Sequence, residues 1–257
     1  MTRNGKRGAN RVAWVTGGGS GIGEAGAEAL AAEGWIVVVS GRRKGALDAV
    51  VAKITAAGGQ AEAIVLDVSV AADVERVAGE IAARHGRIDL LVNSAGINVA
   101  KRRWDDMELD GWNKLVEINL NGVLYCMRAV LPAMRRQQDG IIINVSSWAG
   151  RHVSKMPGPA YTTTKHAVLA LTHSFNMDEC VNGLRACCLM PGEVATPILK
   201  LRPVVPSEEE QAKMLQSEDL GRTIVFVASL PPRVCVNEIL ISPTWNRGFI
   251  QTPANRD

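Results

Sequence analysis

Long hydrophobic runs are absent from this sequence of 257 residues. No segment approaches the roughly 18 consecutive apolar residues of a membrane-spanning helix. No apolar stretch follows the first basic residues, as it would in a secretory signal. We therefore expect a protein that makes no contact with membranes and that resides in the cytoplasm.

Cysteine and histidine are scarce, and neither is spaced like a metal site. The five cysteines include no Cys-x-x-Cys pair, and several stand inside apolar runs. We interpret them as buried thiols in a reducing compartment rather than as disulfide partners or zinc ligands. His166 and His173 lack the i, i+4 spacing and the glutamate of a zinc-binding helix. The sequence therefore predicts no bound metal.

The sequence also lacks a large net charge of either sign. The 29 basic and 26 acidic side chains leave a net charge of +3, which is too small to indicate a nucleic-acid partner. Arg3, Lys6 and Arg7 predict a flexible basic tail over residues 1–10. No linker, composition break or repeat divides the rest, so we expect a single domain over residues 1–257.

Short β-branched runs alternate with longer alanine-rich stretches along the whole sequence. We expect strands at 11–16, 36–40, 63–66, 88–92, 141–145, 184–190 and 236–241. We expect helices at 21–33, 46–57, 70–85, about 110–136, about 159–180, and one ending near residue 230. Strands that are apolar on both faces and separated by helices are typical of parallel sheets. The pattern predicts an α/β fold of the Rossmann type, with a doubly wound, mostly parallel, seven-stranded sheet and helices on both faces.

A glycine-rich turn lies between the first predicted strand and helix, at residues 16–23. Glycines there allow a tight turn and let the backbone approach a pyrophosphate at the N-terminus of the helix. The turn lacks the Gly-Lys-Ser/Thr ending of a P-loop, which disfavours a triphosphate-hydrolysing enzyme. A plain flexible turn is the alternative. The predicted phosphate contacts are Gly17, Gly19, Ser20, Gly21, Ile22 and Gly23.

The end of the second predicted strand indicates which dinucleotide binds. An acidic residue about 20 positions after the glycine turn would hold the ribose hydroxyls of NAD. Arg42, Arg43 and Lys44 stand there instead, and arginine can bind a 2′-phosphate through two hydrogen bonds. We therefore expect NADP(H) as cofactor, held in part by Arg42 and Arg43, with NAD disfavoured. The alternative is that these cations are solvated charges at the start of a helix.

Four polar residues farther along the sequence complete a recognisable pattern. Tyr161 and Lys165 form Tyr-x-x-x-Lys, Asn119 stands in an Asn-x-x-Gly segment, and Ser147 follows the fifth predicted strand. Taken in this order with Thr16-Gly17-x-x-x-Gly21-x-Gly23, they resemble the short-chain dehydrogenase/reductase family in its compact single-domain branch. The resemblance extends from about residue 11 to residue 244, and it implies that these four residues are catalytic.

The resemblance also implies further cofactor contacts. Asn93-Ser94-Ala95-Gly96 resembles the family's Asn-Asn-Ala-Gly segment, with serine in the second place. The pair Asp67 and Val68 would lie beside the adenine. The nicotinamide carboxamide would be held by residues 191–196. The implied contacts are Asp67, Val68, Asn93, Ala95, Gly96, Tyr161, Lys165, Pro191, Gly192, Val194 and Thr196.

Tyr161 and Lys165 are four residues apart and so share one face of a predicted helix. We expect the Lys165 ammonium to favour the phenolate of Tyr161, which then acts as general acid and base on an alcohol or carbonyl. Ser147 would hold the substrate oxygen. By resemblance, Lys165 would hold the ribose hydroxyls of the nicotinamide, and Asn119 would link Lys165 to solvent. Taken singly, each residue could instead be a packing residue, a solvated charge or a cap.

The predicted function is hydride transfer between NADP(H) and a small alcohol or carbonyl compound. Within the family, a 3-oxoacyl-carrier-protein reductase is the alternative, and residues 237–244 are similar to members acting on small 3-hydroxy acids. A non-catalytic NADP(H)-binding sensor is an alternative of another class. The resemblance implies a homodimer or homotetramer with faces at about 110–136 and 159–180.

Three segments flank the predicted catalytic face and are expected to select the substrate. They are residues 97–104, 148–159 and 198–216, the last within a lid at about 197–217. Trp104, Trp148, His152 and Met156 are candidate substrate contacts, although each could equally be a packing residue.

Overall fold

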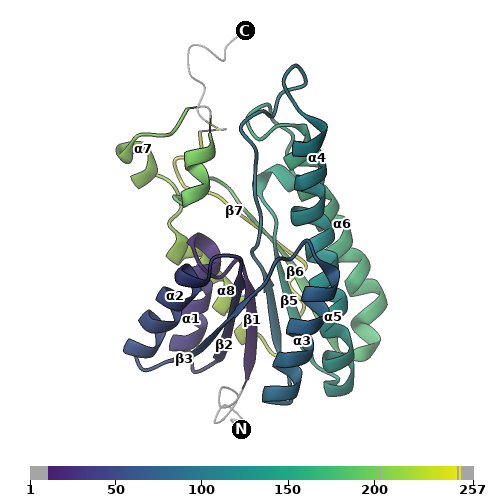
Figure 1. Ribbon diagram of the computed structural model, residues 1–257. Helices are drawn as coiled ribbons and strands as arrows, with labels where there is room; N and C mark the ends of the chain where they lie inside the picture. Colours follow the sequence, from purple (N-terminus) through teal and green to yellow (C-terminus); the bar gives the residue numbers. More distant parts are fainter. Residues whose placement is uncertain (1–10, 203, 248, 250–257) are drawn as a thin grey trace.

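The computed structural model describes residues 11–202, 204–247 and 249, so the basic tail predicted at 1–10 lies outside the described residues. Seven strands form one sheet in the order β3-β2-β1-β4-β5-β6-β7, with every neighbouring pair parallel. Helices cover both faces of this sheet (Figure 1). The predicted doubly wound α/β fold is confirmed.

The strands of the sheet are short, and the central ones are buried on both faces. All residues of β1, β4, β5 and β6 are buried, which explains why most residues of these strands are apolar. The strands are β1 (Val12–Thr16), β2 (Ile36–Gly41), β3 (Gln60–Val65), β4 (Leu90–Asn93), β5 (Gly140–Val145), β6 (Leu184–Pro191) and β7 (Glu238–Ile241).

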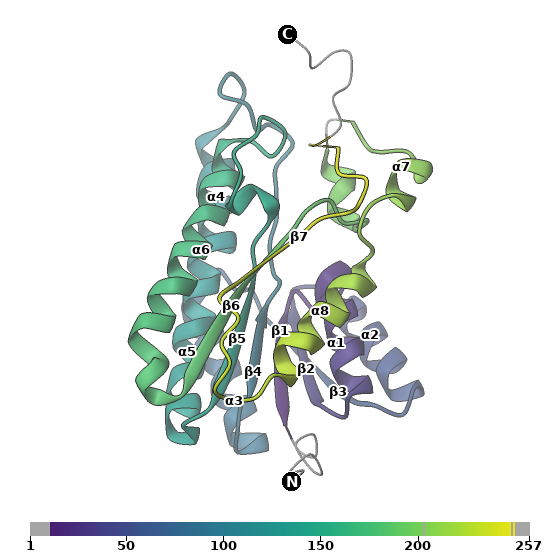
Figure 2. The ribbon, with the colours of Figure 1, turned by 180° about the vertical axis from the view of Figure 1, so that it is seen from behind.

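Three helices cover one face of the sheet. They are α1 (Gly21–Ala32), α2 (Lys44–Ala56) and α8 (Ser217–Ser229), which lie together on one side in Figures 1 and 2. Leu30 of α1 and Ile224 of α8 are fully buried in the same apolar cluster as Val15 and Val39 of the sheet. Within this layer α1 packs against α8, because a Cβ placed on Gly26 of α1 would lie 2.8 Å from the Ile224 side chain.

The opposite face is covered by α3 (Ala71–His85), α5 (Gly122–Gln137) and α6 (Pro159–Glu179). The helix predicted at 110–136 is α4 (Leu109–Val116) followed directly by a π-helical turn (Glu117–Asn121) and then α5. Single π-helical turns inside long helices are frequent at functional sites. This one contains Asn119, one of the predicted catalytic residues.

Three strands begin two or more residues away from the predicted start, and one of them is β4, which begins at Leu90, two residues late. β3 begins at Gln60, three residues early, because it is an edge strand in which Gln60 and Glu62 alternate with alanines. Apolar runs are typical of central strands, so they could not reveal this edge. β7 begins at Glu238, two residues late.

The prediction that the cysteines are buried thiols is only partly right. Cys126, Cys187 and Cys188 are buried, whereas Cys180 and Cys235 are exposed, and all five are free. Cys180 follows directly after α6, and Cys235 stands in the loop before β7. Neither residue lies within the apolar runs that fill the sheet. Among the described residues, no helix combines the length and the apolar character needed to cross a membrane.

Candidate active site

The predicted site residues gather at the carboxyl ends of the strands. β1 and β4 are neighbours in the sheet, but the chain continues from β1 to β2 on one side and from β4 to β5 on the other. Such a switch point leaves a crevice beyond the strand ends, where ligands bind in open α/β sheets. In Figure 1 the segments around α4 and around α7 (Glu208–Ala212) rise on either side above this edge of the sheet.

The glycine turn after β1 is held very close to the segment after β4. Gly17 has a φ of +66°, and a Cβ placed on it would lie 2.7 Å from the backbone nitrogen of Ala95. A Cβ on Gly23 would lie 2.4 Å from the carbonyl oxygen of Gly17. Only glycine fits at these two positions, so the turn brings bare backbone and the N-terminus of α1 to the crevice. This cradle fits a dinucleotide pyrophosphate.

Two arginines follow β2 beside this turn. Arg42 and Arg43 are both exposed, and Arg43 Nη2 donates to Ser20 Oγ at 3.4 Å. The charge of Arg42 also acts on Asp67, the residue expected beside the adenine. Lys44 is engaged elsewhere, because its Nζ lies 2.6 Å from Asp48 of the same helix. Of this segment, Arg43 therefore contacts the glycine turn and Arg42 acts on Asp67.

The expected adenine contacts lie after β3. Burial opposes the ionisation of Asp67, but hydrogen bonds from Ser69 and the charge of Arg42 hold its pKa below the ordinary value. Asp67 Oδ1 accepts both the Ser69 hydroxyl, at 2.6 Å, and the Ser69 backbone N–H, at 3.0 Å. Val68 is 7% exposed and packs against Gly122 at the start of α5. Asp67 is thus a fixed carboxylate beside the cationic segment.

Hydrogen bonds connect the end of β4 to β5 on one side and to β1 on the other. Asn93 Nδ2 donates to Asn144 Oδ1 at 2.9 Å, and Asn144 in turn donates to Thr172 of α6. The backbone nitrogen of Ala95 donates to Thr16 Oγ1 at 3.4 Å. These bonds position the Asn93–Gly96 segment between the glycine turn and α6.

Three of the four predicted catalytic residues meet where β5 ends and α6 begins. Ser147 follows β5 directly, while Tyr161 and Lys165 lie in the first turns of α6. The Ser147 hydroxyl lies near enough to Tyr161 to lower the pKa of the phenol by hydrogen bonding, and Lys165 Nζ lies 5.6 Å from the centre of the Tyr161 ring. The Lys165 Nζ donates to the carbonyl oxygen of Val145 at 2.9 Å, which holds the lysine against the end of β5.

Asn119 completes this arrangement from the π-helical turn. Its side chain makes two 2.9 Å hydrogen bonds to Ile97, accepting from the backbone nitrogen and donating to the carbonyl oxygen. A Cβ placed on Gly96 would lie 3.5 Å from both Asn119 Oδ1 and Lys165 Nζ. Both polar groups thus approach the same glycine, at the ordinary van der Waals distance from a Cβ placed there.

Burial shifts the two titratable groups of the site in opposite directions. Burial raises the pKa of Tyr161 above its ordinary value, although the hydrogen bond from Ser147 and the charges of Arg202 and Arg102 oppose this rise. Burial lowers the pKa of Lys165 to about 8. The charges that oppose the rise belong to Arg202 and Arg102, while the Lys165 ammonium is hydrogen-bonded to the Val145 carbonyl. The expectation that the Lys165 ammonium favours the phenolate of Tyr161 stays a prediction.

The segment after β6 leads into the predicted lid. Val194 is buried and pairs with Leu215, and Thr196 precedes a 3₁₀ turn (Pro197–Leu201). A Cβ on Gly21, whose φ is +57°, would lie 3.2 Å from the Thr196 side chain. The glycine turn therefore meets the start of the lid across the crevice. Gly192, which follows Pro191 at the end of β6, donates its N–H to the Ile241 carbonyl at 2.7 Å.

The carboxylate of Glu193, which binds two arginines, connects the predicted lid to the end of β6. Glu193 Oε1 accepts from Arg202 Nη1 at 2.7 Å, and Glu193 Oε2 accepts from Arg247 Nε at 2.7 Å. Burial opposes its ionisation, but these hydrogen bonds from Arg247 and Arg202 hold the pKa of Glu193 below the ordinary value. Arg247 also contacts Glu210 of α7 at 3.2 Å. Glu193 thus joins the end of β6, the lid and the segment after β7.

The candidate substrate contacts are not all at the site. Trp148 stacks on His152, with ring centres 4.6 Å apart, next to Ser147. Trp104 is 79% exposed and Met156 is 44% exposed, so neither is enclosed by the crevice. Arg102 and Arg202 are not among the residues predicted from the sequence, although both lie in the segments that flank the site. No spacing signal marks them, because arginine in a loop is ordinarily a solvated charge.

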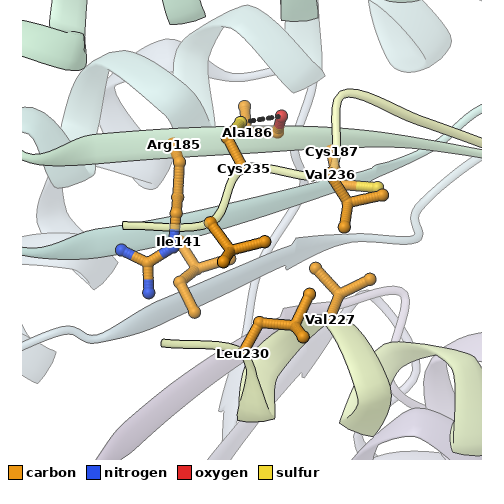
Figure 3. A pocket seen from close by; sticks show the side chains of 9 residues that line it. Ile141, Arg185, Ala186, Cys187, Val227, Leu230, Cys235 and Val236 are labelled. Carbon is orange, nitrogen blue, oxygen red and sulfur yellow. Dashed lines mark hydrogen bonds between the residues drawn. The ribbon is translucent and has the colours of Figure 1, made fainter. Parts of the chain in front are cut away.

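A separate small cavity lies between β5, β6 and α8, away from these residues (Figure 3). Ile141 and Arg185, which line it, stand near the amino ends of their strands, opposite the catalytic edge. Its volume of about 10 Å³ has room for a single water. Cys235 Sγ donates to the Ala186 carbonyl at 3.7 Å beside it. We assign no ligand to this cavity.

Known proteins of similar sequence and structure share this fold. A family model for short chain dehydrogenases matches residues 11–203. An uncharacterized oxidoreductase from Staphylococcus saprophyticus is 33% identical over 236 residues, which cover 91% of this chain and 97% of that protein.

Two solved structures are also similar. A metagenomic short-chain oxidoreductase in complex with NADP is 30% identical, with a TM-score of 0.80 over 93% of this chain and 99% of that one. A closed form of serine dehydrogenase complexed with NADP⁺ is 27% identical, with a TM-score of 0.82 over 90% of this chain and 94% of that one. The chain described here therefore belongs to the short-chain dehydrogenase family and is an oxidoreductase of that family.

Proposed function

We propose that this protein interconverts a small alcohol and the corresponding carbonyl compound with NADP(H) as cofactor, and that Tyr161 is its general acid and base. The observation that carries this proposal is the meeting of Tyr161 with Ser147 and Lys165 at the strand ends that face the glycine turn. The NADP and NADP⁺ bound in two similar structures support the choice of cofactor.

The residues around the crevice fit such a cofactor. The bare backbone at Gly17 and Gly23 would receive the pyrophosphate, and Arg42 and Arg43 would receive the 2′-phosphate. When bound, the reduced nicotinamide supplies a hydride to the carbonyl carbon. The further proposed contacts are Gly19, Ser20, Gly21, Ile22, Asp67, Val68, Asn93, Ala95, Gly96, Tyr161, Lys165, Pro191, Gly192, Val194 and Thr196.

Side chains of the site would transfer a proton to and from the substrate oxygen. The Tyr161 hydroxyl donates its proton to the carbonyl oxygen during reduction and takes it back from the alcohol during oxidation. Ser147 holds that oxygen with a hydrogen bond while its charge changes. Lys165 keeps a proton near Tyr161, and Asn119 positions the Gly96–Ile97 backbone against which Lys165 lies. The raised pKa of Tyr161 suits a proton donor near neutral pH.

An activity panel tests this proposal. Ketones, aldehydes and oxo acids are offered with NADPH and with NADH, and the oxidation of the cofactor is followed by its absorbance. We expect turnover of at least one carbonyl class and a higher kcat/KM with NADPH. If NADPH binds in a fluorescence titration and no carbonyl is reduced, the protein is a cofactor-binding sensor and the proposal is wrong.

A further inference from the structure

Three aromatic side chains meet next to Ser147. Trp148 follows Ser147 in the chain, and its ring stacks on His152, with ring centres 4.6 Å apart and planes 30° apart. Phe249 meets Trp148 nearly edge-on, with ring centres 5.6 Å apart and planes at 70°. Both distances lie in the range at which aromatic rings attract one another. We call Trp148, His152 and Phe249 the aromatic cluster.

The segment after β7 brings Phe249 to this cluster. Arg247 Nε donates to Glu193 Oε2 at 2.7 Å, and Arg247 Nη1 donates to Glu210 of α7 at 3.2 Å. Phe249 stands two residues farther along, which is a reach of about 7 Å at most. The segment after β7 is therefore held against the lid by Arg247 while Phe249 contacts Trp148. The aromatic cluster thus lies between the lid and the end of β5.

Packing of the core does not explain the aromatic cluster. Trp148 is half-buried, and it belongs to neither of the two apolar clusters that the described residues form on the faces of the sheet. His152 is exposed, and 67% of Phe249 is exposed. Exposed rings bury more apolar surface only when a ligand or a partner covers them. The cluster is therefore an uncovered apolar surface next to Ser147, the residue proposed to hold the substrate oxygen.

The segments that flank the crevice carry further exposed apolar side chains. Single exposed apolar residues are normal on a protein surface, but these lie in segments that rise on either side of the crevice (Figure 1). Large exposed patches of this kind mark binding surfaces. The apolar side chains in question are Trp104, Val153, Met156, Ile198 and Val205.

We propose that the aromatic cluster binds an apolar ring of the substrate, and that Phe249 is the specificity-determining residue of this subsite. The substrate class is then a ketone or aldehyde that carries a cycloalkyl or aryl group. Its carbonyl carbon takes the hydride of NADPH, and its oxygen takes the proton of Tyr161, which yields the alcohol. Flat apolar rings pack well against aromatic side chains. This inference rests on the proposed function and names its substrate class.

Matched ketones test this inference. Cyclohexyl methyl ketone is compared, with NADPH, with 4-acetyltetrahydropyran, which has the same shape but an oxygen in place of one ring methylene. Acetone, which lacks the ring, is the third substrate. We expect kcat/KM to be highest for the cyclohexyl ketone and lowest for acetone, because each replacement removes apolar contact with the cluster.

Variants of Phe249 identify the residue responsible. In Phe249→Ala, the ratio of kcat/KM for the cyclohexyl ketone to that for acetone should fall by about tenfold, as for the loss of an apolar contact in a binding pocket. Phe249→Leu keeps an apolar side chain and should retain more of this ratio. The matched control is Phe226→Ala, which removes an exposed phenylalanine of α8 and should leave the ratio unchanged. A merely structural role of Phe249 would lower both rates alike.

A binding measurement separates recognition from turnover. Calorimetry with the NADP⁺-loaded protein compares cyclohexanecarboxamide, an unreactive amide with the same ring, with acetamide. We expect the ring amide to bind more tightly, with a negative change in heat capacity that marks apolar burial. Phe249→Ala should weaken its binding by about tenfold.

The possible results distinguish the two proposals. If the cyclohexyl ketone is reduced no better than acetone, or if its advantage survives in Phe249→Ala, the ring subsite is wrong while the proposed function stands. If no carbonyl is reduced, the proposed function fails and calorimetry decides the subsite. Equal binding of the two amides, or ring-amide binding that is unchanged in Phe249→Ala, would then overturn it. A change of oligomeric state in Phe249→Ala, with the ring preference intact, would assign the cluster to a contact between copies of this chain and would also overturn the subsite.

Discussion

Burial acts in opposite ways on the pKa values of Tyr161 and Lys165, and this contrast bears on the proton transfer that we propose for the site. A buried phenol resists ionisation, so the pKa of Tyr161 rises. A buried ammonium loses its proton more readily, so the pKa of Lys165 falls to about 8. Near neutral pH, both groups therefore carry protons, which suits carbonyl reduction.

This contrast predicts a pH dependence for carbonyl reduction. As pH rises through about 8, Lys165 loses its proton while Tyr161 keeps its own. We expect kcat/KM for reduction to fall across this range, because kcat/KM reports the ionisation of the free enzyme. The measurement is a pH profile of kcat/KM with NADPH in buffers of constant ionic strength. A profile that stays level well above pH 8 would show that the ionisation of Lys165 does not limit reduction.

Some residues of the site could be identified from the sequence, and others could not. Tyr161 and Lys165 are four apart on one helix, so their proximity follows from helical geometry. The nearness of Arg102 and Arg202 to Tyr161 depends on how two loops fold over the sheet, and no local pattern encodes that.

At the scale of elements, the junction of β2 and α2 is the part of the site that we propose to select the cofactor. Arg43 contacts Ser20 of the glycine turn, and the charge of Arg42 acts on Asp67. The sequence predicted this junction well, because the strand, the glycine turn and the helix start are adjacent in the chain. The edge strand β3 was placed less accurately, since its polar residues alternate with small ones.

Replacing Arg42 with aspartate should weaken the preference for NADPH over NADH. The new carboxylate would repel a 2′-phosphate and accept hydrogen bonds from ribose hydroxyls. We expect the ratio of kcat/KM with NADPH to that with NADH to fall by about tenfold or more, as for the loss of one charged hydrogen bond. Lys44→Gln is the control, because the Lys44 ammonium is engaged with Asp48. An unchanged ratio in Arg42→Asp would refute the assignment of the phosphate site.

At the scale of the whole molecule, one parallel sheet assembles the site from distant segments. Gly17, Asn119, Ser147 and Tyr161 are separated by up to 144 residues, yet all lie at the carboxyl ends of strands or on helices that cross them. The alternation of strands and helices predicted this sheet, because the parallel arrangement follows from the pattern itself. The expected homodimer or homotetramer and the cytoplasmic location stay predictions.

The most direct test of the account is Tyr161→Phe, which removes one hydroxyl. We predict that NADPH binds as in the wild type and that carbonyl reduction falls by about 10²–10⁴-fold, the usual contribution of a positioned general acid. Tyr125→Phe, at the second of the two tyrosines, is the control and should keep full activity. Wild-type turnover in Tyr161→Phe would contradict the proposed mechanism.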